Sequence, residues 1–485
     1  MLLALYAVAN TVLIDRYPRV WVDEAWESIT GHVLAHEARL RNPILPGQAR
    51  FDVAFVQPRI LQSILLAPVF GIAGTGHVQG RLLSVAAGAV LLLFVYLLCH
   101  QFWSPRVALA AVWLTMIDTI VFISARTIRP EIFLTALELA CLYFFFLALD
   151  RRSNRHGLIG GILLGIAFWT HPNALLIACA LAVVLLIEFG ASLVKEKLTW
   201  FILVGFAAGI LPFLVYLLTR DVADPIAMFW RQLGERPGAI SQQGWLGVSV
   251  QGEWQRFVEL YRFPQRLFIG ACYFGAWILA FRARDRFIRR IALILLVEGL
   301  LSFLIILNKS VLYATTIVPL VCILAAYLFD QTVHPAFQLR APKTSSPRLP
   351  FTKSHAALLL ALAVSLNQIA GNVYLLWTNR DCSYNDLSQK LQTAIPPHSS
   401  VWGSMAFWFA LQDHPYRTQY TTAEDLTTFK PEYIIAGDRE TWGEKPSWEP
   451  VRRRVEEIVQ RQGGLVASID DRCYGHLRLY RIHWD

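Results

Sequence analysis

Long apolar runs alternate with short polar segments over most of this 485-residue chain. Ten runs contain roughly 14–23 residues each, near the length with which a helix crosses about 30 Å of hydrocarbon. They occupy 80–98, 107–123, 131–149, 157–170, 173–190, 198–218, 265–281, 291–307, 311–329 and 355–377. A shorter run, Met1–Ile14, lacks the basic start and the small-residue cleavage site of a signal peptide, so we interpret it as a first membrane helix. The pattern predicts a mostly α-helical membrane bundle with about eleven spans.

Two longer polar stretches interrupt the bundle. The loop 15–79 contains an amphipathic segment at 23–40 and an apolar segment at 59–73 that is short and bounded by Pro58 and glycines. We expect the apolar segment to be re-entrant or to lie at the membrane interface, because a further crossing would invert every later loop. The stretch 219–264 is rich in Gly, Gln and Trp and suggests a lid.

The C-terminal residues change to a pattern typical of a soluble domain. The strand-like runs SSVWGSMAF, PEYIIAGD and LRLYRI alternate with helical runs such as VRRRVEEIV, which predicts a small α/β domain. The expected organisation is therefore a first helix at 1–14, a loop at 15–79, a helix bundle at 80–377 and a soluble domain at 378–485.

Composition and charge agree with this division and give it an orientation. Hydrophobic residues make up 55% of the chain and charged residues only 16%, against about 25% charged in soluble domains. If the first helix enters from the cytoplasm, the cytoplasmic segments hold 15 lysines and arginines in 57 residues, and the opposite short segments hold 8 in 58. The positive-inside rule then places 15–79 and 378–485 outside, in the periplasm if the membrane is a bacterial inner membrane. Basic patches can also bind nucleic acid or lipid head groups, but short turns between spans favour orientation, and no nucleic-acid partner is expected.

Seven cysteines fit the same arrangement. Five lie in or beside apolar runs, where cysteine behaves as a small hydrophobic residue. Cys382 and Cys473 are the two in the C-terminal domain, and an oxidising outer compartment would let them form a disulfide.

Charged residues beside apolar spans are expected to have a structural or functional role, because burying them is unfavourable. Asp23 and Glu24 follow the first run closely and could deprotonate a hydroxyl or hold a metal ion. The structural alternative is that Asp23 caps the N-terminus of the amphipathic helix.

A second charged cluster, SARTIRPE, contains Arg126, Arg129 and Glu131 between two spans on the same outer side. Two guanidinium groups and a carboxylate could bind a phosphate and a polar acceptor, or they could simply satisfy one another at the surface. The other outer candidates are Arg59, Arg81, His171 and Lys309. A single basic residue at a helix end usually extends to the membrane interface, so none of these residues indicates a site alone. The indication is that all of them lie on the same side of the membrane.

The order of these motifs over residues 15–330 resembles the polytopic GT-C glycosyltransferases of the bacterial protein O-mannosyltransferase and aminoarabinose-transferase-like group. Members carry an acidic pair after the first helix, a proline motif with an apolar helix, an arginine opening the next span, a small-Arg motif ending in an acid, and a Lys followed by Tyr and Pro. The matching positions here are Asp23-Glu24, QPRILQSILLAPVFGIAG, Arg81, Ser124-Ala125-Arg126 through Glu131, and Lys309, Tyr313 and Pro319. The chain departs from the group at Arg59 and Ile60, where many members have Lys and Pro, at Glu131, which is often Asp, and at His171, where Lys is common.

The resemblance implies transfer of a sugar from a polyprenyl-phosphate carrier to a hydroxyl of a lipid, glycan or protein acceptor at the outer membrane face. Asp23 would be the base, with inversion at the anomeric carbon, and Glu24 and Glu131 would orient the acceptor or hold a divalent cation, Mg²⁺ or Mn²⁺. The candidates for binding the donor phosphate are Arg81, Arg126, Arg129 and Lys309. Arg59, His171 and Tyr313 are further candidates for the site.

Two other classes of function fit a polytopic protein. A transporter or flippase of a lipid-linked sugar would carry charged residues near the midplane and often two related halves. Here the spans hold few charges, Glu138 and Glu298 being exceptions, and we find no internal repeat. The third class is a sensor whose outer domain binds a ligand, and only the family resemblance argues against it.

Overall fold

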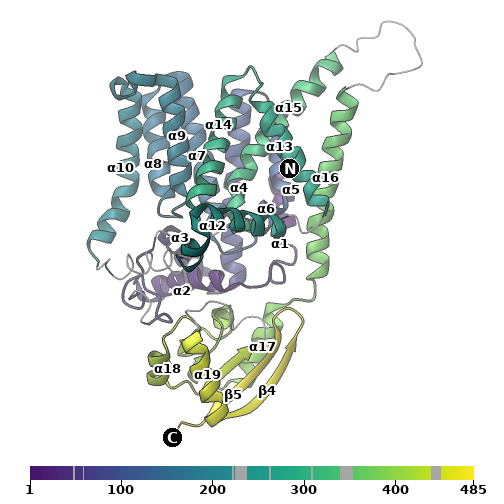
Figure 1. The fold of residues 1–485 in the computed structure, drawn as a ribbon. Helices are drawn as coiled ribbons and strands as arrows, with labels where there is room; N and C mark the ends of the chain where they lie inside the picture. The colour runs from purple at the N-terminus through teal and green to yellow at the C-terminus, as the bar shows by residue number, and fades with distance from the viewer. Residues whose placement is uncertain are drawn as a thin grey trace, which may run out of the picture.

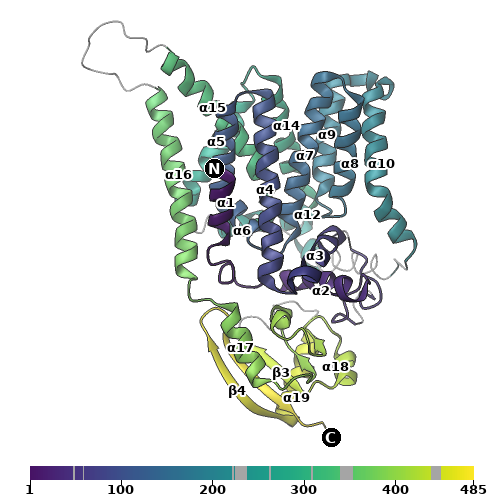
Figure 2. The same cartoon turned by 180° about the vertical axis from the view of Figure 1, so that it is seen from behind.

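The computed structural model describes residues 1–46, 50–57, 59–220, 223, 237–260, 264–306, 310–338, 353–437 and 449–484. Figure 1 shows a helix bundle with a small α/β domain at one end, and Figure 2 shows the same arrangement from behind. Helix α16 (Lys353–Thr378) runs along one side of the bundle and leads into the domain, while α8 and α10 lie at the opposite side. The mostly α-helical fold with a C-terminal α/β domain is as predicted.

The apolar runs form helices with the expected order. The bundle contains α1 (Leu2–Thr11), α4 (His77–Phe102), α5 (Pro105–Ile117), α6 (Thr119–Ala125), α7 (Pro130–Arg151), α8 (Asn154–Ala167), α9 (Ala174–Phe189), η1 (Gly190–Lys195), α10 (Lys197–Leu218), α12 (Pro237–Leu260), α13 (Pro264–Ala280), α14 (Arg286–Ile305), η2 (Val311–Thr315), α15 (Ile317–Gln338) and α16. In the described part of the chain, six helices are long and apolar enough to cross a membrane. A seventh span results if α5 and α6, which meet at an angle of 68°, form one broken span. The chain is a multi-pass membrane protein, and the exact number of spans stays a prediction.

The break between α5 and α6 has a local cause at Asp118. Its backbone is extended, and its carboxylate accepts the N–H of Ile120 at 2.8 Å, which caps the new helix. The same carboxylate accepts hydrogen bonds from Tyr273 of α13 and Gln368 of α16, each at 2.9 Å. The bend therefore joins three parts of the bundle.

Helices α8 and α10 approach closely because glycines line their contact. A Cβ atom on Gly161 would lie 2.2 Å from the Ile202 carbonyl oxygen, and one on Gly205 would lie 2.2 Å from the Leu158 carbonyl oxygen. Gly165 and Gly209 continue the same contact one turn along. Small residues at four-residue spacing let the backbones of membrane helices pack together, in a setting where apolar burial supplies little driving force.

We expect Gly161→Ala to separate these helices and to lower the yield of folded protein severalfold, because backbone atoms rather than flexible side chains oppose the new methyl group. Gly275→Ala is the matched control, since no atom lies within 4 Å of a Cβ at that helical position. Size-exclusion yield and melting temperature measure both variants. Equal behaviour of the two would show that the glycine contact is unimportant.

Two helices of the loop 15–79 lie between the bundle and the domain (Figure 1). Helix α2 (Val22–Glu37) corresponds to the predicted amphipathic segment, and α3 (Ile60–Ala73) packs against it. Neither extends through the bundle, as the sequence predicted for the apolar segment 59–73. Of the proposed lid, α12 and a few flanking residues are described; the other residues of that stretch lie outside the described part.

The C-terminal domain is a five-stranded mixed sheet with helices on both faces. The strand order is β2-β1-β3-β5-β4, with β1 and β2 and likewise β1 and β3 parallel, and β5 antiparallel to both of its neighbours. The strands are β1 (Val401–Trp402), β2 (Tyr416–Arg417), β3 (Tyr433–Gly437), β4 (Gly463–Asp471) and β5 (Gly475–Ile482). Helix α17 (Tyr384–Ala394) packs on one face, and α18 (Ala423–Phe429) and α19 (Glu449–Gln462) pack on the other. The predicted strand SSVWGSMAF is wrong after Trp402, because Met405–Ala410 form a buried 3₁₀ helix, η3.

The domain is attached to the outer loop by polar contacts and by a shared apolar core. Arg16 donates to the Arg380 carbonyl, and the Val20 N–H donates to the Tyr474 hydroxyl at 2.7 Å. Cys382 and Cys473 form a disulfide beside this contact. The loop 15–79 and the domain therefore lie at the same end of the bundle.

Candidate active site

Helix α2 begins with its acidic pair in the first turn, but Asp23 does not cap it. Glu24, at the third helical position, reaches back to accept the N–H of Trp21 at 3.1 Å. The predicted capping role of Asp23 is therefore wrong, and Glu24 takes it. Asp23 is left with 42% of its side chain exposed at the helix start.

Glu24 and Arg81 form a buried ion pair. Arg81 donates to both Glu24 oxygens, from Nε at 2.9 Å and from Nη2 at 2.8 Å, and from Nη1 to the Ile14 carbonyl at 2.6 Å. The Ile128 N–H adds a further bond to Glu24 at 3.1 Å. Both side chains are fully buried and bonded to the protein. In this arrangement Glu24 and Arg81 are bonded to the protein, and the catalytic role of Glu24 and the phosphate-binding role of Arg81 stay predictions.

Arg126 is likewise buried and bonded to the protein. Its guanidinium donates to four backbone carbonyls at the end of α1 and just after it, those of Ala9, Asn10, Val12 and Tyr17, at 2.7–3.2 Å. A helix leaves its last carbonyls without hydrogen-bond partners. Here the buried guanidinium of Arg126 donates those hydrogen bonds. The predicted phosphate contact from Arg126 stays a prediction, because its guanidinium here bonds to these carbonyls.

Arg129 links two of the predicted acids. It donates from Nη1 to Asp23 Oδ2 at 2.5 Å and from Nη2 to Glu131 Oε1 at 2.6 Å. Glu131 is buried at the start of α7, whereas Asp23 remains partly exposed. The two sequence motifs thus meet in one site, with a guanidinium between an exposed and a buried carboxylate.

Glu27 belongs to the same site, although the sequence analysis did not select it. It lies one turn after Asp23 on α2, is fully buried, and has its Oε1 3.6 Å from Arg59 Nη1. Its spacing of four residues from Asp23 places both on one helix face, which is the signal that could have identified it. Arg59 thereby has a place in the site, beside a carboxylate.

His171 and Tyr313 complete the site from two further loops. Their rings lie 5.3 Å apart, and His171 Nδ1 accepts the N–H of Asn173 at 3.1 Å. Burial and the nearby Arg59 lower the pKa of His171 to about 3, so it is neutral at pH 7. Lys309 lies outside the described residues.

The C-terminal domain reaches the edge of the site through an aromatic contact. The rings of Tyr420 and of Trp26 on α2 meet edge to face at 5.3 Å. Burial, with a smaller contribution from Asp23, raises the pKa of Tyr420. The domain therefore forms part of the wall next to Asp23.

Glu27 gives the site a measurable pH dependence. Burial raises its pKa to about 7; Arg59 opposes this shift, and Asp23 and Glu131 add to it. A carboxyl group whose pKa is higher in the folded than in the unfolded state stabilises the fold below its unfolded pKa, and this stability is lost as pH rises through the folded pKa. Between pH 4.5 and 7 we expect ionisation of Glu27 to lower the folding stability of wild type by about 3 kcal/mol. Glu27→Gln, which cannot ionise, should not show this loss. Melting temperatures of wild type and variant from pH 5 to 8 should diverge with rising pH, and parallel curves would contradict the assignment.

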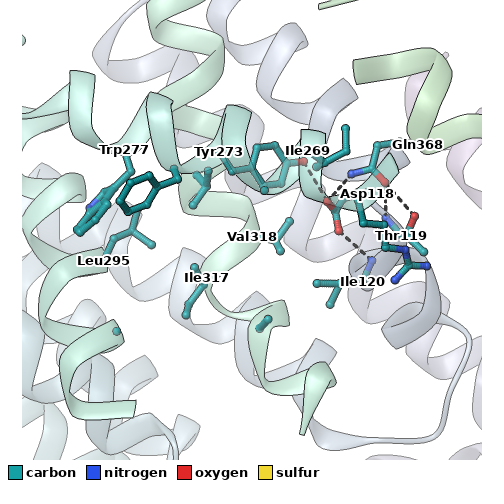
Figure 3. Close-up of a pocket in the computed structure, with 16 residues that line it drawn as sticks. Asp118, Thr119, Ile120, Ile269, Tyr273, Trp277, Leu295, Ile317, Val318 and Gln368 are labelled. Atoms are coloured by element: carbon teal, nitrogen blue, oxygen red, sulfur yellow. Dashed lines mark hydrogen bonds between the residues drawn. The ribbon is translucent and has the colours of Figure 1, made fainter. Parts of the chain in front are cut away.

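A cavity of about 350 Å³ lies in the helix bundle between α13, α14, α15 and the bend at Asp118 (Figure 3). Tyr313 belongs to the charged site, while the next residue, Ala314, lines the cavity. The walls are mostly apolar, with Tyr273, Phe274, Trp277, Leu295, Val318 and Val321 among them. Arg266 and the Asp118–Gln368 pair provide the polar part of the lining. The cavity could take an apolar chain that carries a charged group.

The described residues contain no group of three or more His, Cys, Asp or Glu placed to hold a metal ion. Asp23 and Glu131 are bridged by Arg129. A divalent cation held by Glu24 or Glu131 stays a prediction.

Comparison with known proteins supports the family resemblance. The sequence profile of the family described as dolichyl-phosphate-mannose-protein mannosyltransferase matches residues 58–216. No curated protein matches the sequence. Among solved structures, ArnT from Cupriavidus metallidurans, bound to undecaprenyl phosphate, is similar with a TM-score of 0.65 and 14% identity, over 99% of this chain and 97% of that one. The archaeal oligosaccharyltransferase AglB from Archaeoglobus fulgidus, in complex with an inhibitory peptide and a dolichol-phosphate, gives a TM-score of 0.53 and 13% identity, over 90% of this chain and 69% of that one.

The likeness to ArnT extends over nearly the whole of both chains, so it includes the bundle, the outer loop and the C-terminal domain. The chain therefore has the GT-C glycosyltransferase fold, and the resemblance seen in its sequence is confirmed.

Proposed function

We propose that this protein transfers a sugar from a polyprenyl-phosphate carrier to an acceptor hydroxyl. The single observation that carries the proposal is that a charged site and an apolar cavity adjoin at η2, where Tyr313 belongs to the site and Ala314 lines the cavity. A lipid-linked sugar needs both environments, one for its polar head and one for its chain. ArnT and AglB, which share the fold, were solved with undecaprenyl phosphate and dolichol-phosphate.

Asp23 is the residue placed to activate the acceptor. It is the exposed carboxylate of the site, and Arg129 orients it through one oxygen, Oδ2. It would take the proton of the acceptor hydroxyl while the hydroxyl oxygen bonds to the anomeric carbon and the carbon–oxygen bond to the phosphate breaks. The electron pair of that bond leaves with the polyprenyl phosphate. A weak base suffices because a phosphate is a good leaving group, and a single displacement inverts the anomeric carbon.

The isoprenoid chain would occupy the cavity, and Arg266 at its wall would neutralise the departing phosphate. Arg59 and Lys309 are the other cations proposed to stabilise this charge. Arg129 would act on the phosphate only indirectly, because its described bonds go to Asp23 and Glu131. The acceptor, a lipid, glycan or protein hydroxyl, would approach from the side of the C-terminal domain.

The orientation follows from the charge asymmetry of the loops. We place the site and the C-terminal domain on the periplasmic face of a bacterial inner membrane. The disulfide between Cys382 and Cys473 supports an oxidising compartment for that face.

A transfer assay tests the proposal against a transporter. Purified protein in nanodiscs receives radiolabelled polyprenyl-phosphate sugars and membrane extract, and the readout is label in a new product together with free polyprenyl phosphate. We expect the two to appear in equal amounts. If no donor is consumed, while intact lipid-linked sugar crosses the bilayer of proteoliposomes, the protein is a transporter instead.

A further inference from the structure

The turn between β4 and β5 of the C-terminal domain contacts the segment that leads into α2. It points toward the helix bundle (Figure 1). Tyr474 lies in this turn and is 1% exposed, and its hydroxyl accepts the N–H of Val20 at 2.7 Å. The residue before it, Cys473, accepts a hydrogen bond at its carbonyl from Arg19 Nη1 at 3.3 Å. Two successive residues of the turn therefore hold two successive residues just before the helix that carries Asp23.

The turn is itself fixed in place. The carboxylate of Asp471 accepts the N–H of Cys473 at 2.8 Å and that of Tyr474 at 3.0 Å. The disulfide to Cys382 ties the turn to the chain that follows α16. The ring of Tyr474 meets the ring of Tyr384 edge to face at 5.9 Å. The hydroxyl that accepts from the segment is therefore held by the domain.

The bundle and α2 hold the same segment on either side of Val20. Arg126 donates to the Tyr17 carbonyl at 3.0 Å, and the N–H of Trp21 donates to Glu24 at 3.1 Å. Val20 lies between these contacts and is 1% exposed, so its N–H has little access to water. Because an unpaired buried N–H is unfavourable, loss of its acceptor should shift the segment. The domain thereby sets where α2 begins.

Asp23 is sensitive to the position of this helix start. It lies in the first turn of α2, three residues after Val20, and bonds to Arg129 through one oxygen. A general base must lie within hydrogen-bond reach of the proton that it takes. A displacement of about 1 Å can lower a rate about a hundredfold. A fixed helix start therefore favours a constant distance between Asp23 and the acceptor.

We propose that Tyr474 is a positioning residue for the transfer reaction. Through the N–H of Val20 it fixes the start of α2 and, with it, the place of Asp23. The inference rests on the proposed transferase function and gives the C-terminal domain a part in it. The domain then acts on the reaction through the base, without touching the reacting atoms.

Tyr474→Phe tests the proposal, because it removes the hydroxyl and keeps the ring. In the transfer assay with full-length protein in nanodiscs, we expect kcat to fall about tenfold while KM for the donor stays unchanged. Tyr416→Phe is the matched control and should keep the wild-type kcat. Tyr416 is 2% exposed in the same domain, and its hydroxyl donates within the domain to the Ser404 carbonyl at 2.7 Å. Arg19→Gln removes the neighbouring contact from the other side, should cause a smaller loss of the same kind, and provides the test if Tyr474→Phe does not fold.

Two further measurements separate positioning from a general loss of stability. Hydrogen exchange of the backbone amides in 17–24 should be faster in Tyr474→Phe than in wild type and unchanged in Tyr416→Phe. In an Asp23→Asn background, Tyr474→Phe should cause no further fall in turnover. A residue that acts through Asp23 has no effect once the base is gone, whereas independent losses add.

Wild-type kcat in Tyr474→Phe would overturn the positioning role, and so would unchanged exchange over 17–24 or an equal fall with and without Asp23. The same assays separate this failure from that of the proposed function. Transfer by wild type with no effect of Tyr474→Phe keeps the transferase and removes the positioning residue. Absence of transfer in wild type refutes the transferase, and the exchange measurement then shows alone whether the domain holds the start of α2.

Discussion

Asp23→Asn should lower turnover at least a hundredfold while the protein stays folded. General-base catalysis contributes typically about 10²–10⁴-fold, and asparagine keeps the shape of the side chain but cannot take up the acceptor proton. The ion pair with Arg129 is partly exposed, so its loss should change stability little. Initial rates of sugar transfer at saturating donor, with the melting temperature measured on the same preparation, give the comparison.

Glu37→Gln is the matched control for this variant. Glu37 lies on the same helix, is 40% exposed and pairs with an arginine, Arg41, at 2.6 Å, but it lies outside the site. We expect it to retain wild-type rates. Full activity of Asp23→Asn in a folded protein would rule out Asp23 as the base, and an equal loss in both variants would point to a general charge effect.

Breaking the Glu24–Arg81 pair should have the largest effect on stability. Removing one partner of a buried ion pair leaves an uncompensated charge and destabilises a protein by about 3–5 kcal/mol. Both side chains are fully buried, and each makes a further bond to the backbone at the junction of the first helix, α2 and the turn before α7. Glu24→Gln and Arg81→Met should therefore each reduce the folded fraction strongly.

The double variant Glu24→Gln/Arg81→Met distinguishes a structural pair from two independent functional residues. Because it removes both charges, we expect it to recover part of the lost melting temperature relative to Arg81→Met. An exposed pair on α19, Glu449 and Arg453, provides the control. The same double-mutant cycle on this pair should give a coupling energy below about 1 kcal/mol. If the single variants are stable and folded but inactive, this account is contradicted. Glu24 and Arg81 would then act in catalysis.

Sequence patterns identified the fold well because membrane helices are encoded locally. Hydrophobicity over a few turns is enough to predict the apolar runs. The same holds for the amphipathic segment that corresponds to α2 and the short segment that corresponds to α3. The close contact of α8 and α10 was not predicted, because it depends on which glycines of two separate runs face each other. Hydrophobicity alone also does not determine the number of spans, since α1 is apolar but short.

The site was predicted less completely, for a different physical reason. The sequence selected Asp23, Arg129 and Glu131 as charges near the membrane face, and the structure brings the three together. Arg81 and Arg126 gave the same signal, but their partners are buried groups far away in the sequence, which hydrophobic patterning does not reveal. Glu27 was missed because one acid in an amphipathic helix usually faces water, and only the packing of α3 buries it.

The central claim is a single displacement at the anomeric carbon with Asp23 as base. NMR on a polyprenyl-phosphate sugar labelled with ¹³C at that carbon tests it most directly, with purified protein in nanodiscs and membrane extract as the source of acceptor. We predict that the donor signal disappears in step with the release of polyprenyl phosphate and that the product signal has the opposite anomeric configuration. Retention of configuration, or an unchanged donor signal, would contradict the account.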